Sequence, residues 1–192
     1  MCGRYLVEDE VYADLWATLS QGSQAPLPAT GEIYPSTMAP VILSGGAASL
    51  IWGFPHWKRT GIIINARSET AREKSMFQKP LLEGRCVVPS SGFYEWDRNS
   101  GGKKKNKYLL REPGATVLYM AGISAAFRGP SGEEYRAFAI LTTSASESVS
   151  RIHDRMPVIL ARDEADPWLA DFAFARYALR RAGPELEAAM CR

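Results

Sequence analysis

The chain has 192 residues and a mass of 21.2 kDa, 46% of its residues are hydrophobic, 23% are charged, and its formal net charge is +2. These values predict one globular domain over residues 1–192 and exclude a disordered chain or a membrane protein, because no apolar run is long enough to span a bilayer. Residues 1–5 have neither the basic nor the apolar region of a secretory signal peptide, so we expect a cytoplasmic protein with no membrane association.

The first third of the chain predicts one helix, a loop and a hairpin. Apolar residues recur at helical spacing at positions 12, 15, 16 and 19, after acidic residues at positions 8–10, which predicts a helix over 8–19. Residues 20–36 contain Gly, Ser and three prolines and are typical of a surface loop. A Gly-Gly turn between two apolar segments predicts a hairpin of strands 38–44 and 48–53.

The remainder alternates short apolar segments with turn signals. Strands are expected at 61–64, 85–89, 92–97, 107–111, 116–123 and 135–143, and helices at 66–77, 146–151, 163–173 and, weakly, 184–190. Strands that follow one another without helical crossovers favour an antiparallel or mixed sheet. The predicted fold class is therefore α+β, a mostly antiparallel or mixed sheet curled toward a barrel, with peripheral helices.

Positive charge is concentrated in the middle of the chain. Residues 58–111 contain 13 Lys and Arg against 5 Asp and Glu, whereas the rest contains 10 against 16. This segregation indicates an anionic partner, with nucleic acid among the candidates. Part of it comes from Lys103, Lys104 and Lys105 beside the turn-like residues 99–102, which we interpret as a solvated loop.

Cysteine and histidine are too sparse for a recognised metal or disulfide pattern. The three cysteines, Cys2, Cys86 and Cys191, form no CxxC pair, and the two histidines, His56 and His153, are far apart. We therefore expect no disulfide framework, no metal and no other cofactor.

Cys2 follows the initiator methionine, which methionine aminopeptidase normally removes before a small residue. The exposed cysteine would carry an α-amine of pKa about 7.7–8.0 beside a thiol of pKa about 8.5. The amine can form a Schiff base with an aldehyde, and the thiol can then close on the same carbon to give a thiazolidine. The alternative is an incidental small residue at a frayed terminus.

The apolar segment 62–64 ends in polar residues. Asn65 offers a hydrogen-bond donor and an acceptor, and Arg67 can bind a phosphate through two hydrogen bonds. Alternatively, Asn65 or Ser68 caps the following helix, with Glu69 in its first turn. The spacing leaves both interpretations open.

Glu95 lies between aromatic residues on a predicted strand. Alternation places Phe93 and Glu95 on one face and Tyr94 and Trp96 on the other. A carboxyl group beside apolar neighbours tends toward a raised pKa and suits proton transfer. A solvent-facing glutamate is the alternative.

His153 lies among charged residues in a predicted loop at 152–157, where functional side chains are common. Histidine is the side chain most readily tuned for proton transfer near neutral pH. A surface histidine without a role is the alternative.

Three tryptophans accompany these motifs. If Trp52, Trp57 or Trp96 were exposed near a basic groove, each could stack on an unpaired base. Core packing is the alternative for each of them. Trp16 and Trp168 fall in helical patterns, and we assign them to packing.

Together, Cys2-Gly3-Arg4 and the motifs at 65–70, 92–96 and 152–157 resemble the SRAP (SOS response-associated peptidase) family in order and spacing, across nearly the whole chain. The resemblance implies a protein that recognises abasic sites in single-stranded DNA and links to them covalently, shielding the lesion at stalled replication. It implies a monomer that is associated with the nucleoid when crosslinked.

The resemblance also implies roles for individual residues. Cys2 would be the nucleophile that forms the thiazolidine with the ring-opened deoxyribose aldehyde, and Asn65 would orient the Cys2 amine and the sugar. Glu95 and His153 would transfer protons during ring opening, Schiff-base formation and crosslink reversal. A lyase activity that cleaves the strand could accompany the Schiff base.

Further positions match family residues near the DNA. Arg4, Arg67 and Arg155 correspond to residues that contact phosphates or shape the site, and Trp52 corresponds to a tryptophan near the DNA path. One segment departs from the family. Many members carry an asparagine shortly before an Ala-Pro in the first loop, whereas residues 34–40 read Tyr-Pro-Ser-Thr-Met-Ala-Pro, so that asparagine's role is in doubt here.

Two other functions are compatible with these residues. In a cysteine amidohydrolase or autoprocessing peptidase, Cys2 would attack an amide with His153 as base and Glu95 assisting. In a non-catalytic single-strand binder, the basic segment and the tryptophans would hold DNA without a covalent bond. Of the three functions, only the one implied by the resemblance to the SRAP family predicts a reaction with an aldehyde.

Overall fold

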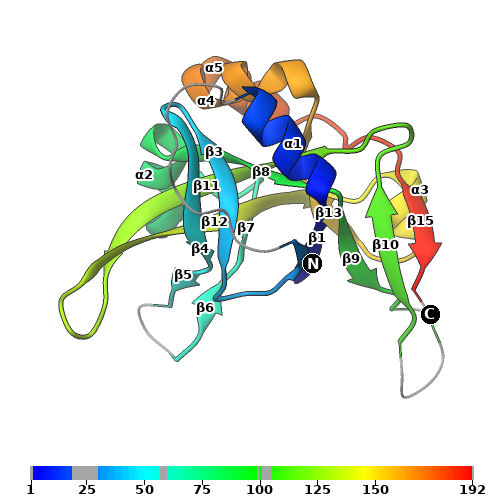
Figure 1. Cartoon of the computed structure of the whole chain (residues 1–192), viewed down its shortest axis with the longest axis horizontal. Helices are drawn as coiled ribbons and strands as arrows, with labels where there is room; N and C mark the ends of the chain where they lie inside the picture. The colour runs from blue at the N-terminus through cyan, green and yellow to red at the C-terminus, as the bar shows by residue number, and fades with distance from the viewer. Residues whose placement is uncertain (1, 19–29, 57–59, 99, 101–104, 192) are drawn as a thin grey trace.

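The computed structural model describes residues 2–18, 30–56, 60–98, 100 and 105–191, which form two large sheets and a separate two-stranded sheet, with short helices around them (Figure 1). One sheet curls into a ring and is mixed, because two of its pairings are parallel and the others are antiparallel. The predicted α+β class with a sheet curled toward a barrel is confirmed. None of the helices in these residues is long and apolar enough to cross a membrane.

Five strands close the ring. These are β3 (Met38–Leu43), β4 (Gly46–Trp52), β8 (Arg85–Ser90), β11 (Leu118–Arg128) and β12 (Glu134–Ser144). β4 pairs with β3 and with β12, β3 pairs with β8, and β11 pairs with both β8 and β12, so the hydrogen-bonded path returns to its start. Closure leaves no free edge in this part of the sheet and encloses much of the apolar core.

The second sheet lies beside the ring. Its order is β15 (Glu187–Met190), β10 (Lys107–Arg111), β9 (Gly92–Trp96), β1 (Arg4–Val7) and β2 (Gly31–Ile33), and all its pairings are antiparallel. β9 follows β8 after a single residue, so one chain segment passes from the ring into this sheet. Figure 1 shows β1 between the ring strands on the left and β9, β10 and β15 on the right.

Short strands complete the sheets next to the functional residues. β5 (Phe54–Pro55) pairs with β6 (Ile62–Ile63), and β7 (Asn65–Arg67) pairs in parallel with β12. β13 (Arg155–Pro157) also pairs with β12, and β14 (Ile159–Leu160) pairs with β11. β7 and β13 therefore meet on the same central strand.

The helices are peripheral, as expected. They are α1 (Asp9–Thr18), α2 (Ser75–Glu83), α3 (Glu147–Ser150), a 3-10 turn at Arg162–Glu164, α4 (Ala165–Ala170) and α5 (Phe172–Ala178). The predictions at 8–19 and 146–151 are confirmed. The predicted helix at 163–173 is interrupted at Asp171, whose side chain accepts the Ala173 N–H at 2.7 Å and starts a separate helix.

Two helix predictions are wrong: the first places the start of the helix too early, and the second predicts a helix where the structure has a strand. The helix expected over 66–77 begins only at residue 75, because residues 65–67 extend β7 along β12 and turns follow. The helix expected over 184–190 contains a strand instead, since residues 187–190 pair with β10 at the sheet edge. Most of the predicted 20–36 loop, Trp57, Lys103 and Lys104 lie outside the described residues.

Candidate functional site

Four residues from separate parts of the chain meet at the junction of the two sheets. Asn65, at the start of β7, donates from Nδ2 to the carbonyl oxygen of Cys2 at 2.8 Å. The Nε2 atom of His153 lies 3.9 Å from the Oε2 atom of Glu95. Cys2 and Glu95 also interact: burial raises the pKa of the Cys2 thiol, and the Glu95 carboxylate raises it further.

Strand register brings Cys2 to Glu95. β1 pairs with β9 so that Arg4 is opposite Tyr94 and Tyr5 is opposite Phe93. The residues before Arg4 therefore run toward the end of β9 that carries Glu95. Cys2 is fully buried rather than frayed, and its Sγ donates to the Arg4 carbonyl oxygen at 3.6 Å.

Alternation along β9 follows the prediction. Phe93 and Glu95 are buried, and Glu95 is only 2% exposed, which excludes the solvent-facing alternative. Tyr94 and Trp96 share the other face, where the Nζ atom of Lys107 lies 3.8 Å and 5.9 Å from their ring centroids. The strand thus turns its only carboxylate toward the interior.

Asn65 is not a helix cap. Asn65 lies in a strand that pairs with β12, and the residue at the N-cap position of α2 is Lys74. The Oδ1 atom of Asn65 is buried and has no hydrogen-bond partner among the described residues. The Nδ2 group of Asn65 binds the Cys2 carbonyl oxygen, and its Oδ1 atom can accept a hydrogen bond from a further N–H or O–H group at this position.

His153 is a buried, neutral imidazole. Burial lowers its pKa to about 4, and the positive charges of the N-terminus and Arg98 act in the same direction. It is 5% exposed, so the surface alternative is excluded. Its Nδ1 atom accepts the Arg155 N–H at 3.0 Å, which assigns the ring hydrogen to Nε2, the atom that faces Glu95.

Asp154 also lies 3.0 Å from Nδ1 and would favour a proton on that atom. Its side chain is 64% exposed and pairs with Arg98 at 2.9 Å, so solvent and the arginine weaken its effect on the ring. The buried backbone donor therefore decides the tautomer.

Glu95 and Cys2 are both shifted toward their protonated forms. Burial raises the pKa of the Glu95 carboxyl, and the charge of the N-terminus opposes this shift. Burial also raises the pKa of the Cys2 thiol, well above its ordinary range. The site consequently holds a neutral thiol, a carboxyl that can retain a proton, and a neutral imidazole.

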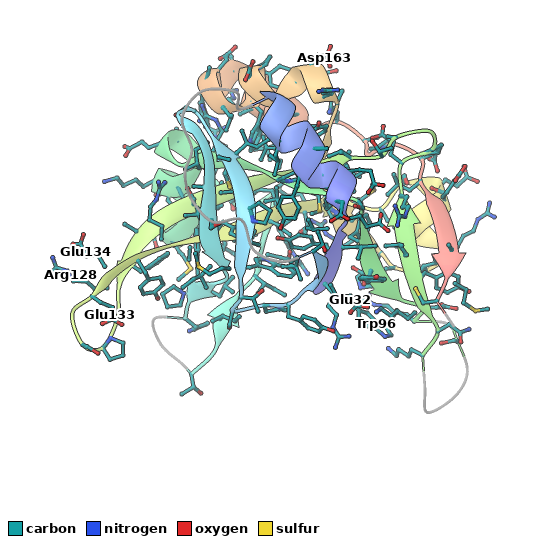
Figure 2. All side chains as sticks on the ribbon, viewed as in Figure 1. Glu32, Trp96, Arg128, Glu133, Glu134 and Asp163 are labelled. Atoms are coloured by element: carbon teal, nitrogen blue, oxygen red, sulfur yellow. The ribbon has the colours of Figure 1, made fainter. Side chains whose placement is uncertain are left out.

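The three predicted DNA-contacting arginines have different environments. Arg4 lies over the rings of Tyr34 and Trp96, at 4.6 Å and 5.3 Å, and 3.6 Å from Glu32. Figure 2 shows Glu32 and Trp96 close together at this edge of the second sheet. Arg4 is thus held in a defined position with part of its side chain exposed.

Arg155 and Arg67 differ in how far their charge is compensated. Arg155 donates to Glu69 Oε2 at 2.9 Å and to the Thr142 carbonyl oxygen at 2.6 Å. Arg67 is exposed and makes no ion pair among the described residues. Sequence reasoning missed the role of Glu69, because its partner is 86 positions away.

Trp52 belongs to the core. It is fully buried, its ring stacks against Phe138 with 6.3 Å between centroids, and its Nε1 donates to the Ile64 carbonyl oxygen at 3.1 Å. The ring has no exposed face on which a base could stack. Instead, it holds the backbone immediately before Asn65.

A cavity of about 550 Å³ opens beside Asn65. Ile63, Asn65 and Arg67 line one side, and Lys74 with the first turn of α2 lines the other. This volume is within the range of small-ligand sites. Its walls combine the acceptor oxygen of Asn65 with two positive side chains, Arg67 and Lys74, and one negative side chain, Glu73. The net positive charge and the acceptor suit a polar ligand that carries both a hydrogen-bond donor and a negative charge.

The divergent segment at 34–40 forms a turn. Ser36 has φ of 67°, a left-handed conformation that asparagine adopts more readily than serine, and its N–H donates to the Trp52 carbonyl oxygen at 2.8 Å. The Thr37 hydroxyl donates to the Tyr34 carbonyl oxygen at 2.7 Å. The backbone of this turn therefore forms without an asparagine, and both residues are exposed.

The described residues contain no group of three or more His, Cys, Asp or Glu side chains that could hold a metal ion. All three cysteines are free in this structure, with Cys2 and Cys86 buried.

Comparison with protein families identifies one match. A family model described as SOS response associated peptidase (SRAP) matches residues 1–186. The abasic site processing protein YoqW of Bacillus subtilis is 34% identical over 184 residues, which cover 88% of this chain and 80% of that protein. The abasic site processing protein HMCES of Gallus gallus is 43% identical over 128 residues, covering 57% of this chain and 38% of that protein.

Solved structures share the fold. A crystal structure of a protein from Bacteroides thetaiotaomicron superimposes with a TM-score of 0.86 at 25% identity, covering 100% of this chain and 92% of that chain. A phage-related protein from Bordetella bronchiseptica gives a TM-score of 0.75 at 31% identity, covering 100% and 94%.

Proposed function

The chain belongs to the SRAP family, and from this premise we propose that it processes abasic sites in single-stranded DNA by linking Cys2 to them covalently. The observation that carries the proposal is the bond from Asn65 to the Cys2 carbonyl beside the buried Glu95–His153 pair. The names of the curated relatives, abasic site processing proteins, support the same substrate.

The reaction begins once Met1 has been removed by hydrolysis, which gives Cys2 a free α-amine. This amine has an ordinary pKa of about 7.7–8.0 and is therefore partly unprotonated at neutral pH. The free Oδ1 atom of Asn65 can accept a hydrogen from this amine or from a sugar hydroxyl. Asn65 thus holds the nucleophile through its main chain and orients the reacting groups.

The chemistry joins an aldehyde to an aminothiol with loss of one water. The amine attacks C1′ of the ring-opened deoxyribose, and the resulting carbinolamine loses water to give a Schiff base. Sγ then adds to C1′, and the thiol proton passes to the nitrogen, which closes the thiazolidine. Because the thiol pKa is raised, the amine is the first nucleophile and the thiol the second.

Glu95 moves the protons, and His153 holds it in position. The Glu95 carboxyl, with its raised pKa, protonates the departing hydroxyl and assists opening of the sugar ring. The carboxylate that remains takes a proton back from the iminium nitrogen, which gives the neutral Schiff base, while the neutral His153 ring keeps its proton on Nε2 and faces this carboxylate. The same groups, acting in reverse, open the thiazolidine and release the crosslink.

DNA is held by basic side chains around this centre. We assign phosphate contacts to Arg4 and Arg67, and to Arg155 when its pairing with Glu69 is relaxed by the nearby DNA charge. Trp52 acts by supporting the backbone that precedes Asn65. Specificity comes from the aldehyde, which undamaged DNA lacks.

A Schiff base to C1′ also permits β-elimination at the 3′ phosphate, which is an abasic-site lyase reaction. The alternative function, a cysteine peptidase or amidohydrolase, requires a thiolate as the first nucleophile. The raised pKa of the Cys2 thiol disfavours that form. Autoproteolytic removal of Met1, in place of removal by methionine aminopeptidase, is the one peptidase activity that the proposal retains.

The proposal is tested with protein whose N-terminus has been verified by mass spectrometry. After incubation with an abasic single-stranded oligonucleotide, we expect an SDS-stable species whose intact mass equals protein plus DNA less one water. The undamaged oligonucleotide should give none. Cys2→Ala should abolish the stable adduct, and Asn65→Ala should slow it at least tenfold through lost positioning.

Cys2→Ser is the matched control, because it keeps the amine and replaces the thiol by a hydroxyl group of similar size. It should form a Schiff base that borohydride traps, without a stable adduct in its absence. A stable adduct of undiminished yield from Cys2→Ala would refute the assignment, as would an acyl-enzyme formed with an amide substrate and no reaction with the aldehyde.

A further inference from the structure

A second, larger cavity lies beyond the candidate site. Its volume is about 830 Å³, and three segments line it: the turn after β7, the end of β12, and the end of α5 with the residues that follow it. Glu73 lines both this cavity and the smaller one beside Asn65, so the two adjoin.

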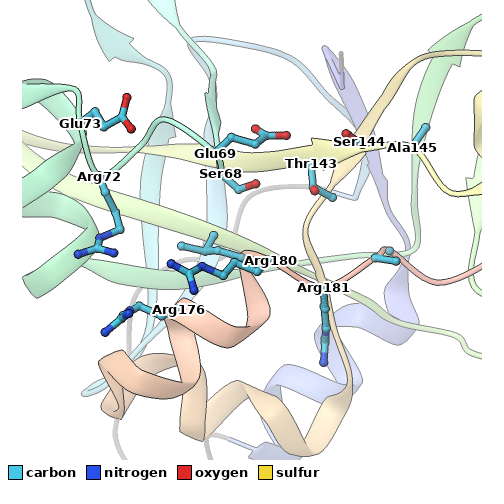
Figure 3. A pocket seen from close by; sticks show the side chains of 13 residues that line it. Ser68, Glu69, Arg72, Glu73, Thr143, Ser144, Ala145, Arg176, Arg180 and Arg181 are labelled. Carbon is cyan, nitrogen blue, oxygen red and sulfur yellow. The ribbon is translucent and has the colours of Figure 1, made fainter.

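The larger cavity has an excess of uncompensated positive charge. Arg72, Arg176 and Arg180 line it and make no ion pair among the described residues. Figure 3 shows their guanidinium groups gathered on one side of the cavity, whereas Arg181 is directed away from them and pairs with Glu164. Of the acidic lining residues, Glu69 is paired with Arg155, which leaves Glu73 as the opposing charge.

A buried hydroxyl group in the same wall lacks a partner. Ser68 is 5% exposed, and its Oγ atom makes no hydrogen bond among the described residues. Its backbone is fixed, because the Ser68 N–H donates to the Thr142 carbonyl oxygen at 2.8 Å. A buried hydroxyl without a partner is costly unless a ligand supplies an acceptor. Three arginines and a hydroxyl donor are the groups that bind phosphate oxygens.

We propose that this cavity binds a backbone phosphate of the DNA strand that carries the abasic site, a few nucleotides from the reacting sugar. Ser68 lies three residues beyond Asn65, about 10 Å along an extended chain, a span that a DNA strand covers in a few nucleotides. The exposed Arg67 lies between the two positions. This inference rests on the proposed function and extends it, because it assigns the strand's path away from Cys2.

The test varies oligonucleotide length and the arginines together. A series carries the abasic site with zero to six nucleotides on its 5′ or 3′ side, and the adduct rate is measured against DNA concentration. For the wild-type protein, we expect the half-saturating DNA concentration to fall roughly tenfold when the strand reaches one particular length, on one side of the abasic site only. We call this fall the length step. In the Arg176→Gln/Arg180→Gln variant this fall should disappear, while the rate at saturation stays unchanged.

The matched control removes the same charge elsewhere. Lys79→Gln/Arg128→Gln alters two exposed residues, on α2 and at the tip of the β11–β12 hairpin, where Figure 2 labels Arg128. It should keep the wild-type length step. An uncharged methylphosphonate linkage at the nucleotide that produces the length step should weaken binding to the wild type as much as removal of that nucleotide does. It should not further weaken binding to the Arg176→Gln/Arg180→Gln variant.

Anisotropy measured with undamaged oligonucleotides separates this proposal from the proposed function. If the wild type binds with the length step but forms no adduct, the covalent chemistry fails and the phosphate site stands. If the arginine variant keeps the length step, the phosphate site is refuted. Saturable binding of deoxyadenosine monophosphate that the variant loses, with no length step in the wild type, would assign the cavity to a free phosphate monoester and overturn the strand assignment.

Discussion

Glu95 and His153 are shifted in opposite directions by the same cause. Burial disfavours the charged form of each, so it raises the pKa of the carboxyl and lowers that of the imidazole to about 4. The Oε2 atom of Glu95 and the Nε2 atom of His153 lie 3.9 Å apart. A carboxyl with a raised pKa beside a neutral imidazole suits general acid and base catalysis.

The opposite shifts predict opposite effects of pH on folding. Between pH 4 and the ordinary value of 6.5, the unfolded chain protonates His153 and the folded chain does not, so the free energy of unfolding rises with pH. Glu95 acts in the other direction, because the folded carboxyl keeps its proton above pH 4.5 and stability falls as pH rises through its folded pKa.

In the Glu95→Gln variant, which keeps His153, the free energy of unfolding should therefore rise by at most about 3 kcal/mol as the pH increases from 4.5 to 6.5. In the His153→Gln variant, which keeps Glu95, it should fall over the same range. Urea unfolding at several pH values measures both. The double variant Glu95→Gln/His153→Gln supplies the background slope from all other groups. Equal slopes for the two single variants after this subtraction would contradict the assigned shifts.

At the scale of elements, Arg85 joins two helices to the ring. This first residue of β8 is 8% exposed and donates to four main-chain carbonyls: Leu81 and Leu82 at 3.0 Å and 2.8 Å, and Trp168 and Leu169 at 2.6 Å and 2.9 Å. The last carbonyls of a helix lack partners within it, and the guanidinium satisfies those of α2 and α4. In the sequence, Arg85 is one of the basic residues of the segment 58–111, and its carbonyl partners cannot be recognised there.

Replacing Arg85 should destabilise the protein strongly. Arg85→Met leaves buried carbonyls without donors and should lower the free energy of unfolding by about 3 kcal/mol or more, measured in urea. Arg85→Lys should lose less, because the ammonium group satisfies some of them. Arg128→Met, at the exposed hairpin tip, should change stability by less than about 0.5 kcal/mol. An Arg85→Met variant as stable as this control would refute the role.

At the scale of the whole molecule, pairing reduces the basic segment's effective charge. Several of its cations bind partners: Arg85 bonds to carbonyls, Arg98 pairs with Asp154, Lys79 with Glu83, Lys107 with Glu32 and Arg111 with Glu8. Among the described residues, the cations without ion pairs near the two cavities are Arg67, Lys74 and Arg72 in this segment, with Arg176 in α5 and Arg180 just after that helix.

This distribution predicts a modest salt dependence for DNA binding. One phosphate each for Arg4, Arg67, Arg155 and Lys74, and one for the arginine-lined cavity, make about five contacts. Five contacts to single-stranded DNA give a slope of log K against log salt of about −3.5, whereas eight would give about −6. The measurement uses the Cys2→Ala variant and an undamaged oligonucleotide, so that no adduct forms. Arg176→Gln/Arg180→Gln in the same background should reduce the slope by about 0.7, the equivalent of one contact. A slope near −6 would show that paired cations other than Arg4 and Arg155 also bind DNA.

Local sequence signals predicted most elements, and they failed where pairing partners are distant. The hairpin at 38–53 and the strands at 85–97 follow from apolar runs and turn residues, which act over a few positions. Local signals place Ala66 and Arg67 in a helix, because the pairing of β7 with β12 depends on residues more than 70 positions away. The same holds for residues 187–190, which pair with β10.

The motifs by themselves determined which residues we propose to carry the chemistry, since an aminothiol, an amide, a carboxyl and an imidazole have their reactivity as residue types. Only the tertiary structure decided their environment: Asn65 meets Cys2 across 63 positions, and Glu95 and His153 are buried together. It also placed Trp52 in the core, paired Arg155 with Glu69, and brought α5 to the turn after β7. The physical reason is that burial and charge compensation depend on contacts between distant segments, which local sequence patterns do not contain.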